Sequence, residues 1–238
     1  MNPSSLQDMG YLGAKSGSGV YQTIVALMPP HETYIEPFAG SGAILARKPP
    51  AARSIVLDKD PAAVAALQAW AHELAGDVKI LEADALEYLA RLDVAQLGRV
   101  LVYLDPPYIH ATRTSAKRYR CELADIDHAN LARIVGQLSD AGCAIILSGY
   151  PSPHYDDFYA GWSTREFQAM TRGGVRTEKL WFNFEPGAAH WSTFAGRNFT
   201  DRQRIKRKAA RWAAKFAALP PAERQAVLAA LLEAEGGA

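Results

Sequence analysis

Short apolar runs alternate with segments of helical spacing along the first 185 residues of the chain. Runs of a length and β-branched content that suit buried strands occur at residues 33–35, 54–57, 79–81, 99–104 and 144–147. Helical patterns are predicted over residues 20–28, from about Ala43, from Pro61, over residues 85–91 and from Asp127, which we expect to be an N-cap. Strands that alternate with helices favour an α/β fold with a doubly wound, mostly parallel sheet of Rossmann-like type.

The composition changes near Pro186, so we expect a catalytic domain over residues 1–185 and a basic, helical C-terminal region over residues 186–238. Ile205, Trp212, Phe216 and Leu219 give the basic run an apolar stripe at helical spacing. Pro220-Pro221 then separates a final helix over residues 222–233. Its apolar face either packs onto the preceding domain or supports a homodimer.

The charge distribution and the composition restrict the kinds of partner and the cellular setting that this protein can have. Residues 1–112 carry a net charge of −4 and residues 113–238 a net charge of +5, so a polyanionic partner would meet the second half. No apolar stretch is long enough for a membrane span, and no secretion signal is recognisable. Of the two cysteines, Cys143 opens an apolar run and is expected in the core, which favours a reduced, cytoplasmic setting at the nucleoid.

Asp105-Pro106-Pro107-Tyr108 directly follows the apolar run at residues 99–104. A carboxylate and the carbonyl of Pro106 can accept hydrogen bonds from a planar amino group, the prolines fix the backbone, and an aromatic ring can stack on the same group. The alternative is a strand that simply ends in a proline turn.

Polar or glycine-rich residues follow four successive predicted strands, namely Gly40 with Gly42, Asp58, Asp84 and Asp105. In an open α/β sheet, ligands bind beyond the carboxyl ends of the strands. Asp58 lies at the interval from Gly40 at which an acid can take ribose hydroxyls, and the loop has no Lys-Ser/Thr pair for a triphosphate. The pattern indicates a nucleoside without phosphates, such as S-adenosyl-L-methionine, with Asp84 accepting from its adenine. Each Asp alone is equally explained as an N-cap.

These motifs resemble those of the Dam-like (D12-type) DNA N6-adenine methyltransferases. The segment 11–15 resembles the family's N-terminal cofactor motif, residues 36–42 its glycine-rich loop, and 178–183 a late core strand. The resemblance implies a cofactor site made of Tyr11, Lys15, Glu36, Pro37, Phe38, Ala39, Gly40, Ser41, Gly42, Asp58, Asp84 and Asp105. It implies a catalytic motif made of Asp105, Pro106, Pro107 and Tyr108.

The chemistry that the resemblance implies is methyl transfer from S-adenosyl-L-methionine to N6 of an adenine in double-stranded DNA. The adenine must be flipped out of the duplex to reach such a pocket. Asp105 and the Pro106 carbonyl would orient the amine while Tyr108 stacks on the base. No metal and no covalent nucleophile are needed, because the sulfonium is already activated, and positioning does most of the work.

The chain departs from the Dam-like pattern in its DNA contacts. Asp84 and Asp105 are too close in sequence for the target-recognition domain that Dam relatives carry between the third and fourth strands, so a GATC target is not implied. DNA contacts are expected instead from a loop at residues 109–124 and from residues 197–215. The candidate side chains are Arg113, Lys117, Arg118, Arg120, Arg202, Arg204, Lys206, Arg207, Lys208 and Arg211. Solvated polar surface is the alternative for both segments.

Three other functions stay open. An RNA base-amine methyltransferase is the nearest, since D-P-P motifs also serve base amines in RNA. An N4-cytosine DNA methyltransferase usually carries Ser in place of Asp105, and a DNA-binding regulator on a decayed methyltransferase fold would not need Asp58, Asp105 and Tyr108. Asp125-Ile126-Asp127-His128 suggests a metal site only superficially, because no further ligand cluster accompanies it.

Overall fold

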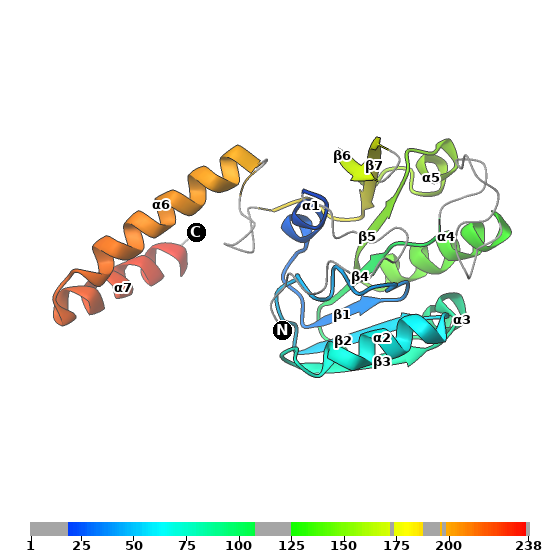
Figure 1. The fold of residues 1–238 in the computed structure, drawn as a ribbon, viewed down its shortest axis with the longest axis horizontal. Coiled ribbons are helices and arrows are strands. Elements are labelled where there is room, and N and C mark those ends of the chain that lie inside the picture. The colour runs from blue at the N-terminus through cyan, green and yellow to red at the C-terminus, as the bar shows by residue number, and fades with distance from the viewer. Residues whose placement is uncertain (1–18, 108–124, 172–173, 188–195, 197–198, 237–238) are drawn as a thin grey trace. The chain divides into compact units, whose positions relative to one another are not determined.

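The computed structural model describes residues 19–107, 125–171, 174–187, 196 and 199–236, and it divides the chain into two compact units (Figure 1). The first unit runs from Met1 to His190 and the second from Trp191 to Ala238. The division falls close to Pro186, where the composition changes.

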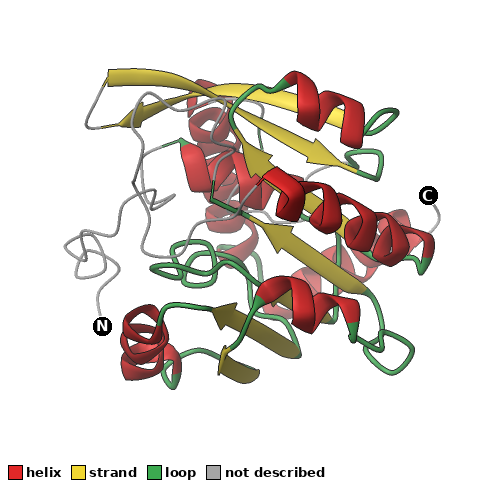
Figure 2. Ribbon diagram, turned by 90° about the vertical axis from the view of Figure 1, so that its right-hand side faces the viewer, coloured by secondary structure: helices red, strands yellow, loops and turns green. Residues whose placement is uncertain are grey.

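The first unit is built on one seven-stranded sheet with the strand order β3-β2-β1-β4-β5-β7-β6. The strands are β1 (Thr33–Glu36), β2 (Arg53–Asp58), β3 (Asp77–Glu82), β4 (Val100–Leu104), β5 (Ala144–Gly149), β6 (Ser163–Thr171) and β7 (Gly174–Phe182). The first five pair in parallel, whereas β7 is antiparallel to both β5 and β6. The predicted doubly wound, mostly parallel sheet is therefore confirmed, and the β6–β7 hairpin forms one edge (Figure 2).

In the described part of this unit, α1 (Val20–Leu27) precedes the first strand, and four helices lie between successive strands: α2 (Pro61–Ala71), α3 (Ala85–Ala90), α4 (Asp125–Asp140) and α5 (Pro153–Phe158). α2 begins at Pro61 as predicted, because proline suits the first helical position and the Asp60 carboxylate accepts from the Ala62 N–H at 3.0 Å. Gly142 lies two residues after the end of α4 and has a positive φ of 85°, the left-handed conformation with which many helices end.

One continuous apolar cluster joins the sheet to α3, α4 and α5. Alternate residues of the central strands, such as Ile35, Val102 and Ile145, point into it. Leu131 of α4 and Tyr155 of α5 pack against them, each almost inaccessible to solvent. Cys143 is a free, buried thiol in the same cluster, as the sequence predicts.

Three sequence-based expectations differ from the structure. The helix predicted from Ala43 is wrong, because residues 40–47 form successive turns. The Ala46 N–H donates to the carbonyl four residues earlier, whereas the Arg47 N–H donates to the carbonyl only three residues earlier, so the regular pattern of an α-helix is interrupted. Prolines follow at positions 49 and 50. Asp127 is not an N-cap, since α4 begins two residues earlier and contains it. β6 was not predicted, because Ser163–Thr171 mixes charged and apolar residues on a largely exposed edge strand.

The second unit contains α6 (Phe199–Ala217) and α7 (Pro221–Gly236), so both predicted C-terminal helices are confirmed. No residue of α6 is buried. Among the residues that the structure describes, no helix combines the length and the apolar character needed to cross a membrane.

Asn183 ties the end of β7 to its neighbours and gives a test of the fold. Its Oδ1 accepts from the Ile145 N–H, and its Nδ2 donates to Ser139 Oγ and to the Cys143 carbonyl, each at 2.8 Å. Asn183→Ala leaves these groups without the partner, so we expect the free energy of unfolding to fall by about 1–3 kcal/mol in urea denaturation. Gln168→Ala, which removes an exposed contact on β6, should cost less than about 0.5 kcal/mol. Equal losses in both variants would contradict the role given to Asn183.

Candidate active site

The strand order places the sheet's topological switch point, which is the position of the ligand crevice in open α/β sheets, between β1 and β4. From β1 the chain proceeds outward through β2 to β3, whereas β4 leads to β5 on the opposite side. Connections therefore diverge at the carboxyl ends of the paired strands β1 and β4, which is where open α/β sheets bind ligands. The glycine-rich segment 36–42 follows β1 and Asp105-Pro106-Pro107 follows β4, so the two motifs meet at this point.

The glycine-rich loop is held against the end of β2. The Ala39 N–H donates to the Leu57 carbonyl at 3.0 Å, and the Gly40 N–H donates to Asp58 Oδ2 at 2.7 Å. Gly40 and Gly42 both have positive φ, 51° and 67°, which disfavours other residues. A Cβ on Gly42 would also collide with Leu67 and would lie 2.8 Å from Trp70 Cζ2. Close packing on α2 therefore fixes the path of the loop.

Asp58 links the loop to the start of α2. Besides accepting from Gly40, its carboxylate accepts from the Asp60 N–H at 2.8 Å through Oδ1. Burial raises the pKa of Asp58 above its ordinary value, although these backbone N–H groups act against the rise. A carboxylate has about four acceptor positions, so the backbone donors Gly40, Asp60 and Lys59 leave capacity for a ribose hydroxyl.

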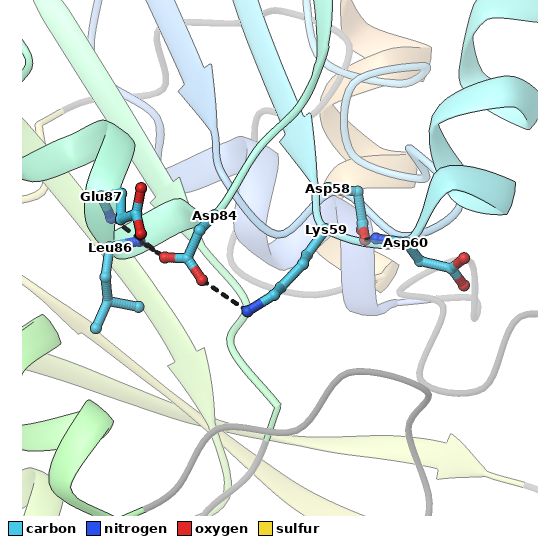
Figure 3. A network of polar contacts seen from close by, with 6 residues as sticks. All are labelled: Asp58, Lys59, Asp60, Asp84, Leu86 and Glu87. Atoms are coloured by element: carbon cyan, nitrogen blue, oxygen red, sulfur yellow. Dashed lines mark hydrogen bonds and ion pairs between the residues drawn. The ribbon is translucent and has the colours of Figure 1, made fainter.

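Asp84 lies at the start of α3, one strand further out, and caps that helix (Figure 3). Its Oδ1 accepts from the N–H groups of Leu86 and Glu87, and its Oδ2 contacts Lys59 Nζ at 3.0 Å. Burial acts to raise the pKa of Asp84, but the Lys59 ammonium and the backbone donors together hold it below its ordinary value. The N-cap role that the sequence left open is thus realised, and the adenine contact stays a prediction.

Asp105 is half-buried and receives a hydrogen bond from the neighbouring strand. Ser148 Oγ on β5 donates to Asp105 Oδ1 at 2.8 Å, and Ser148 Oγ lies 3.3 Å from the Tyr103 hydroxyl. Because the single Ser148 proton is given to the carboxylate, Tyr103 is the donor in the second contact. The chain Tyr103–Ser148–Asp105 holds the orientation of the carboxyl group, and Pro106 beside it is buried.

Glu36 lies on the β1 side of the crevice and is almost completely buried. The Tyr34 hydroxyl donates to its Oε2 at 2.9 Å. Burial raises the pKa of Glu36 to about 8, against the effects of the Tyr34 hydroxyl, Lys48 and the Leu45 N–H, whereas Asp105 adds to the rise. Burial also lowers the pKa of Lys48 to about 8, opposed by Glu36, and its Nζ lies 4.4 Å from the centre of the Tyr34 ring.

The structure brings together Glu36, the loop that follows it, Asp58 and Asp105, with Asp84 at the next strand end. Several predicted site residues lie outside the described residues, namely Tyr11, Lys15, Tyr108, Arg113, Lys117, Arg118 and Arg120. Sequence reasoning missed Ser148, Tyr103, Tyr34, Lys48 and Lys59. A serine inside the apolar run of β5 was the one available signal, and its partner lies forty-three positions away.

The side chains and loop fit a nucleoside cofactor that carries no phosphates. Carboxylates occur at the ends of β2 and β4 and near the end of β3, and the glycine loop presents no lysine to a phosphate chain. Within the described ranges, no group of three or more His, Cys, Asp or Glu side chains is arranged to hold a metal ion.

Comparison with known proteins gives matches of two kinds. Residues 19–120 match the family model described as conserved hypothetical protein 95. No curated protein matches the chain. Similar solved structures include precorrin-8w decarboxylase from Methanobacterium thermoautotrophicum, with 14% identity over 71% of this chain and 90% of that one, at a TM-score of 0.46.

Two further structures carry methyltransferase names given by inference. The protein yhhF from Escherichia coli shares 24% identity over 64% of this chain and 77% of that one, with a TM-score of 0.37. The RNA methyltransferase PH1948 from Pyrococcus horikoshii shares 14% identity over 76% and 95%, with a TM-score of 0.47.

The buried pair Glu36 and Lys48 predicts an unusual dependence of stability on pH. Between pH 4.5 and about 8 the native state keeps a proton on Glu36 that the unfolded chain releases, so the free energy of unfolding falls as pH rises. From about 8 to 10.5 the unfolded chain holds the extra proton on Lys48, and stability rises again. We expect a minimum near pH 8, with slopes of up to about 1.4 kcal/mol per pH unit.

Glu36→Gln should remove the falling limb and leave the rising one. Thermal unfolding across this pH range measures both, and Glu166→Gln, at an exposed position of β6, is the matched control. Identical pH profiles for wild type and Glu36→Gln would contradict the protonated state assigned to Glu36.

Proposed function

We propose that this chain is an S-adenosylmethionine-dependent methyltransferase that modifies an exocyclic amine of a nucleobase within a nucleic acid. One observation carries the proposal: Asp105-Pro106-Pro107 leaves β4 beside the glycine-rich loop of β1, at the crevice where the sheet's connections diverge. This adjacency supports a site for a base amine next to a site for a nucleoside cofactor.

The residues divide into those that hold the cofactor and those that hold the amine. The loop 37–42 and Asp58 would hold the cofactor, with Asp58 on the ribose and the loop against the methionine end. Bound S-adenosyl-L-methionine would supply a methyl group already activated on its sulfonium. No general base or metal has to be invoked to activate the methyl group.

The task of Asp105 and the Pro106 carbonyl is to orient a weak nucleophile. The lone pair of an exocyclic amine is delocalised into the base, and two acceptors on its hydrogens favour a more tetrahedral nitrogen. Orientation of reacting groups accounts for much of the rate in such reactions, roughly 7–11 kcal/mol where it is complete. The bond from Ser148 matters in this scheme because it fixes the plane of the Asp105 carboxylate.

Of the two possible methyl acceptors, RNA and DNA, we infer that RNA is the better candidate. The connection from β3 to β4 consists of the six-residue α3 and short turns, so the structure has no recognition domain of the kind that Dam relatives insert here. Bases in single-stranded RNA loops are also accessible without opening a duplex. Adenine N6 in duplex DNA is the second candidate, favoured by the resemblance of residues 105–108 to the Dam-like motif.

The proposal is tested by Asp105→Ala. We expect transfer of labelled methyl groups to nucleic acid to fall roughly 10²–10³-fold or more, as when an essential oriented group is removed. Total RNA and genomic DNA from a host without base methylation serve as separate substrates, and modified nucleosides are identified by mass spectrometry. Asp140→Ala, exposed at the end of α4, controls for loss of a carboxylate elsewhere. Wild-type transfer by Asp105→Ala would refute the mechanism.

Ser148→Ala tests the positioning of Asp105. The bond it removes is made to a charged group and is worth about 1.5–3 kcal/mol, so we expect kcat to fall about tenfold or more with little change in the KM for S-adenosylmethionine. Ser148→Cys, nearly isosteric and a weaker donor, should retain an intermediate kcat. If Ser148→Ala keeps the wild-type kcat across the pH profile, Asp105 does not depend on this bond.

A further inference from the structure

α6 concentrates positive charge more than any other helix that the structure describes. Its 19 residues include a single acid, Asp201, and seven basic side chains. The basic residues are Arg202, Arg204, Lys206, Arg207, Lys208, Arg211 and Lys215. α7, the other helix of the same unit, has one basic and three acidic residues. The charge asymmetry of the chain's second half is therefore focused on one helix rather than spread over the unit.

Four of these cations share one face of α6. Arg204, Lys208, Arg211 and Lys215 recur at intervals of four, three and four residues, which places them in line along an α-helix. A helix of this length extends roughly 28 Å, so the line of charge is long enough to follow several phosphates. All four side chains are exposed.

The one acid of α6 offsets little of this charge. Asp201 Oδ1 accepts from Arg204 Nε at 3.0 Å and from its Nη2 at 2.9 Å, so the pair is local to the first turns of the helix. The remaining cations of the stripe lie further along the helix, toward Ala217.

An apolar stripe lies directly beside the basic one. Ile205, Ala209, Trp212 and Phe216 repeat the same spacing one position later in sequence. Trp212 is 64% exposed, and Lys215 Nζ lies 5.4 Å from the centre of its ring. An exposed indole next to a row of cations is the arrangement with which proteins hold unpaired nucleotides, since bases stack on the ring while phosphates meet the charges.

We propose that α6 is a docking helix for an unpaired stretch of nucleic acid, with its basic stripe on the phosphodiester backbone and Trp212 stacked on a base. The inference rests on the proposed function in that the docked polymer is the methyl acceptor. It adds a substrate-binding element in the second unit and a preference for single strands. An anionic membrane surface suits this helix less well, because its apolar stripe is narrow and Arg202 and Lys206 lie on the other side of it.

A matched pair of triple variants of the full-length chain tests the basic stripe. Arg204, Lys208 and Arg211 are replaced by Gln in one, and Lys79, Arg91 and Arg133, exposed on the first unit, in the other. Binding of labelled single-stranded RNA and of duplex DNA is followed by anisotropy at increasing salt. Each lost phosphate contact lowers the slope of log affinity against log salt by about 0.7 for single strands, so we expect a decrease of about 2 in the α6 triple variant alone. An unchanged slope, or equal decreases in both variants, overturns the proposal.

Trp212 gives a second, independent measurement. Trp212→Ala should weaken binding to single-stranded RNA about 5- to 100-fold at unchanged salt slope, affect duplex DNA much less, and be largely rescued by Trp212→Phe. Vesicles of anionic phospholipid are the rival probe. If the α6 variants lose vesicle binding and keep oligonucleotide binding, the helix serves a membrane and the proposal is wrong.

The same variants separate this inference from the proposed function. A chain that binds RNA through α6 but transfers no methyl group to any nucleic acid refutes the proposed function and leaves the docking helix in place. A chain whose α6 triple variant methylates RNA with the wild-type KM refutes the docking helix and leaves the proposed function in place.

Discussion

β1 and β4 pair in parallel from Thr33 opposite Val100 to Ile35 opposite Val102, and the candidate site depends on this pairing. Among the described parallel strands, the chain's connections diverge at this junction, which is where open α/β sheets bind ligands. Segment 36–42 and Asp105-Pro106-Pro107 therefore share one crevice, although more than sixty residues separate them. Their chemistry follows from this adjacency: one motif suits a nucleoside, the other an amine.

Burial in low-dielectric surroundings shifts the pKa values of two ionisable side chains next to the candidate site. Glu36 and Lys48 are both buried, and burial moves both pKa values toward about 8 from opposite directions. Asp105, by contrast, is only half-buried and receives a hydrogen bond from Ser148. Two acids at neighbouring strand ends are thus placed in different environments, Glu36 almost completely buried and Asp105 partly accessible to solvent.

Much of the fold can be predicted from local sequence patterns, and the features that cannot be predicted in this way have physical causes. β4 and residues 144–147 of β5 are continuous apolar runs because both of their faces are covered, and such runs are readily recognised. β6 has a mixed pattern because it lies at the sheet edge, and the turns at residues 40–47 resemble a helix only in composition. Asp58 and Asp105 could be identified from their places after strands. Ser148 could not, because its role depends on the register of β5 against β4, which no local signal specifies.

The central claim is that the crevice between β1 and β4 binds S-adenosyl-L-methionine, and calorimetric titration of that cofactor into the full-length protein tests it most directly. We predict saturable binding at one site, weakened about tenfold or more in Asp58→Ala, because the carboxylate that holds the glycine loop, and that we propose to bind the ribose, is lost. Asp140→Ala should bind as wild type. Absence of binding, or equal affinity in wild type and Asp58→Ala, would contradict the account.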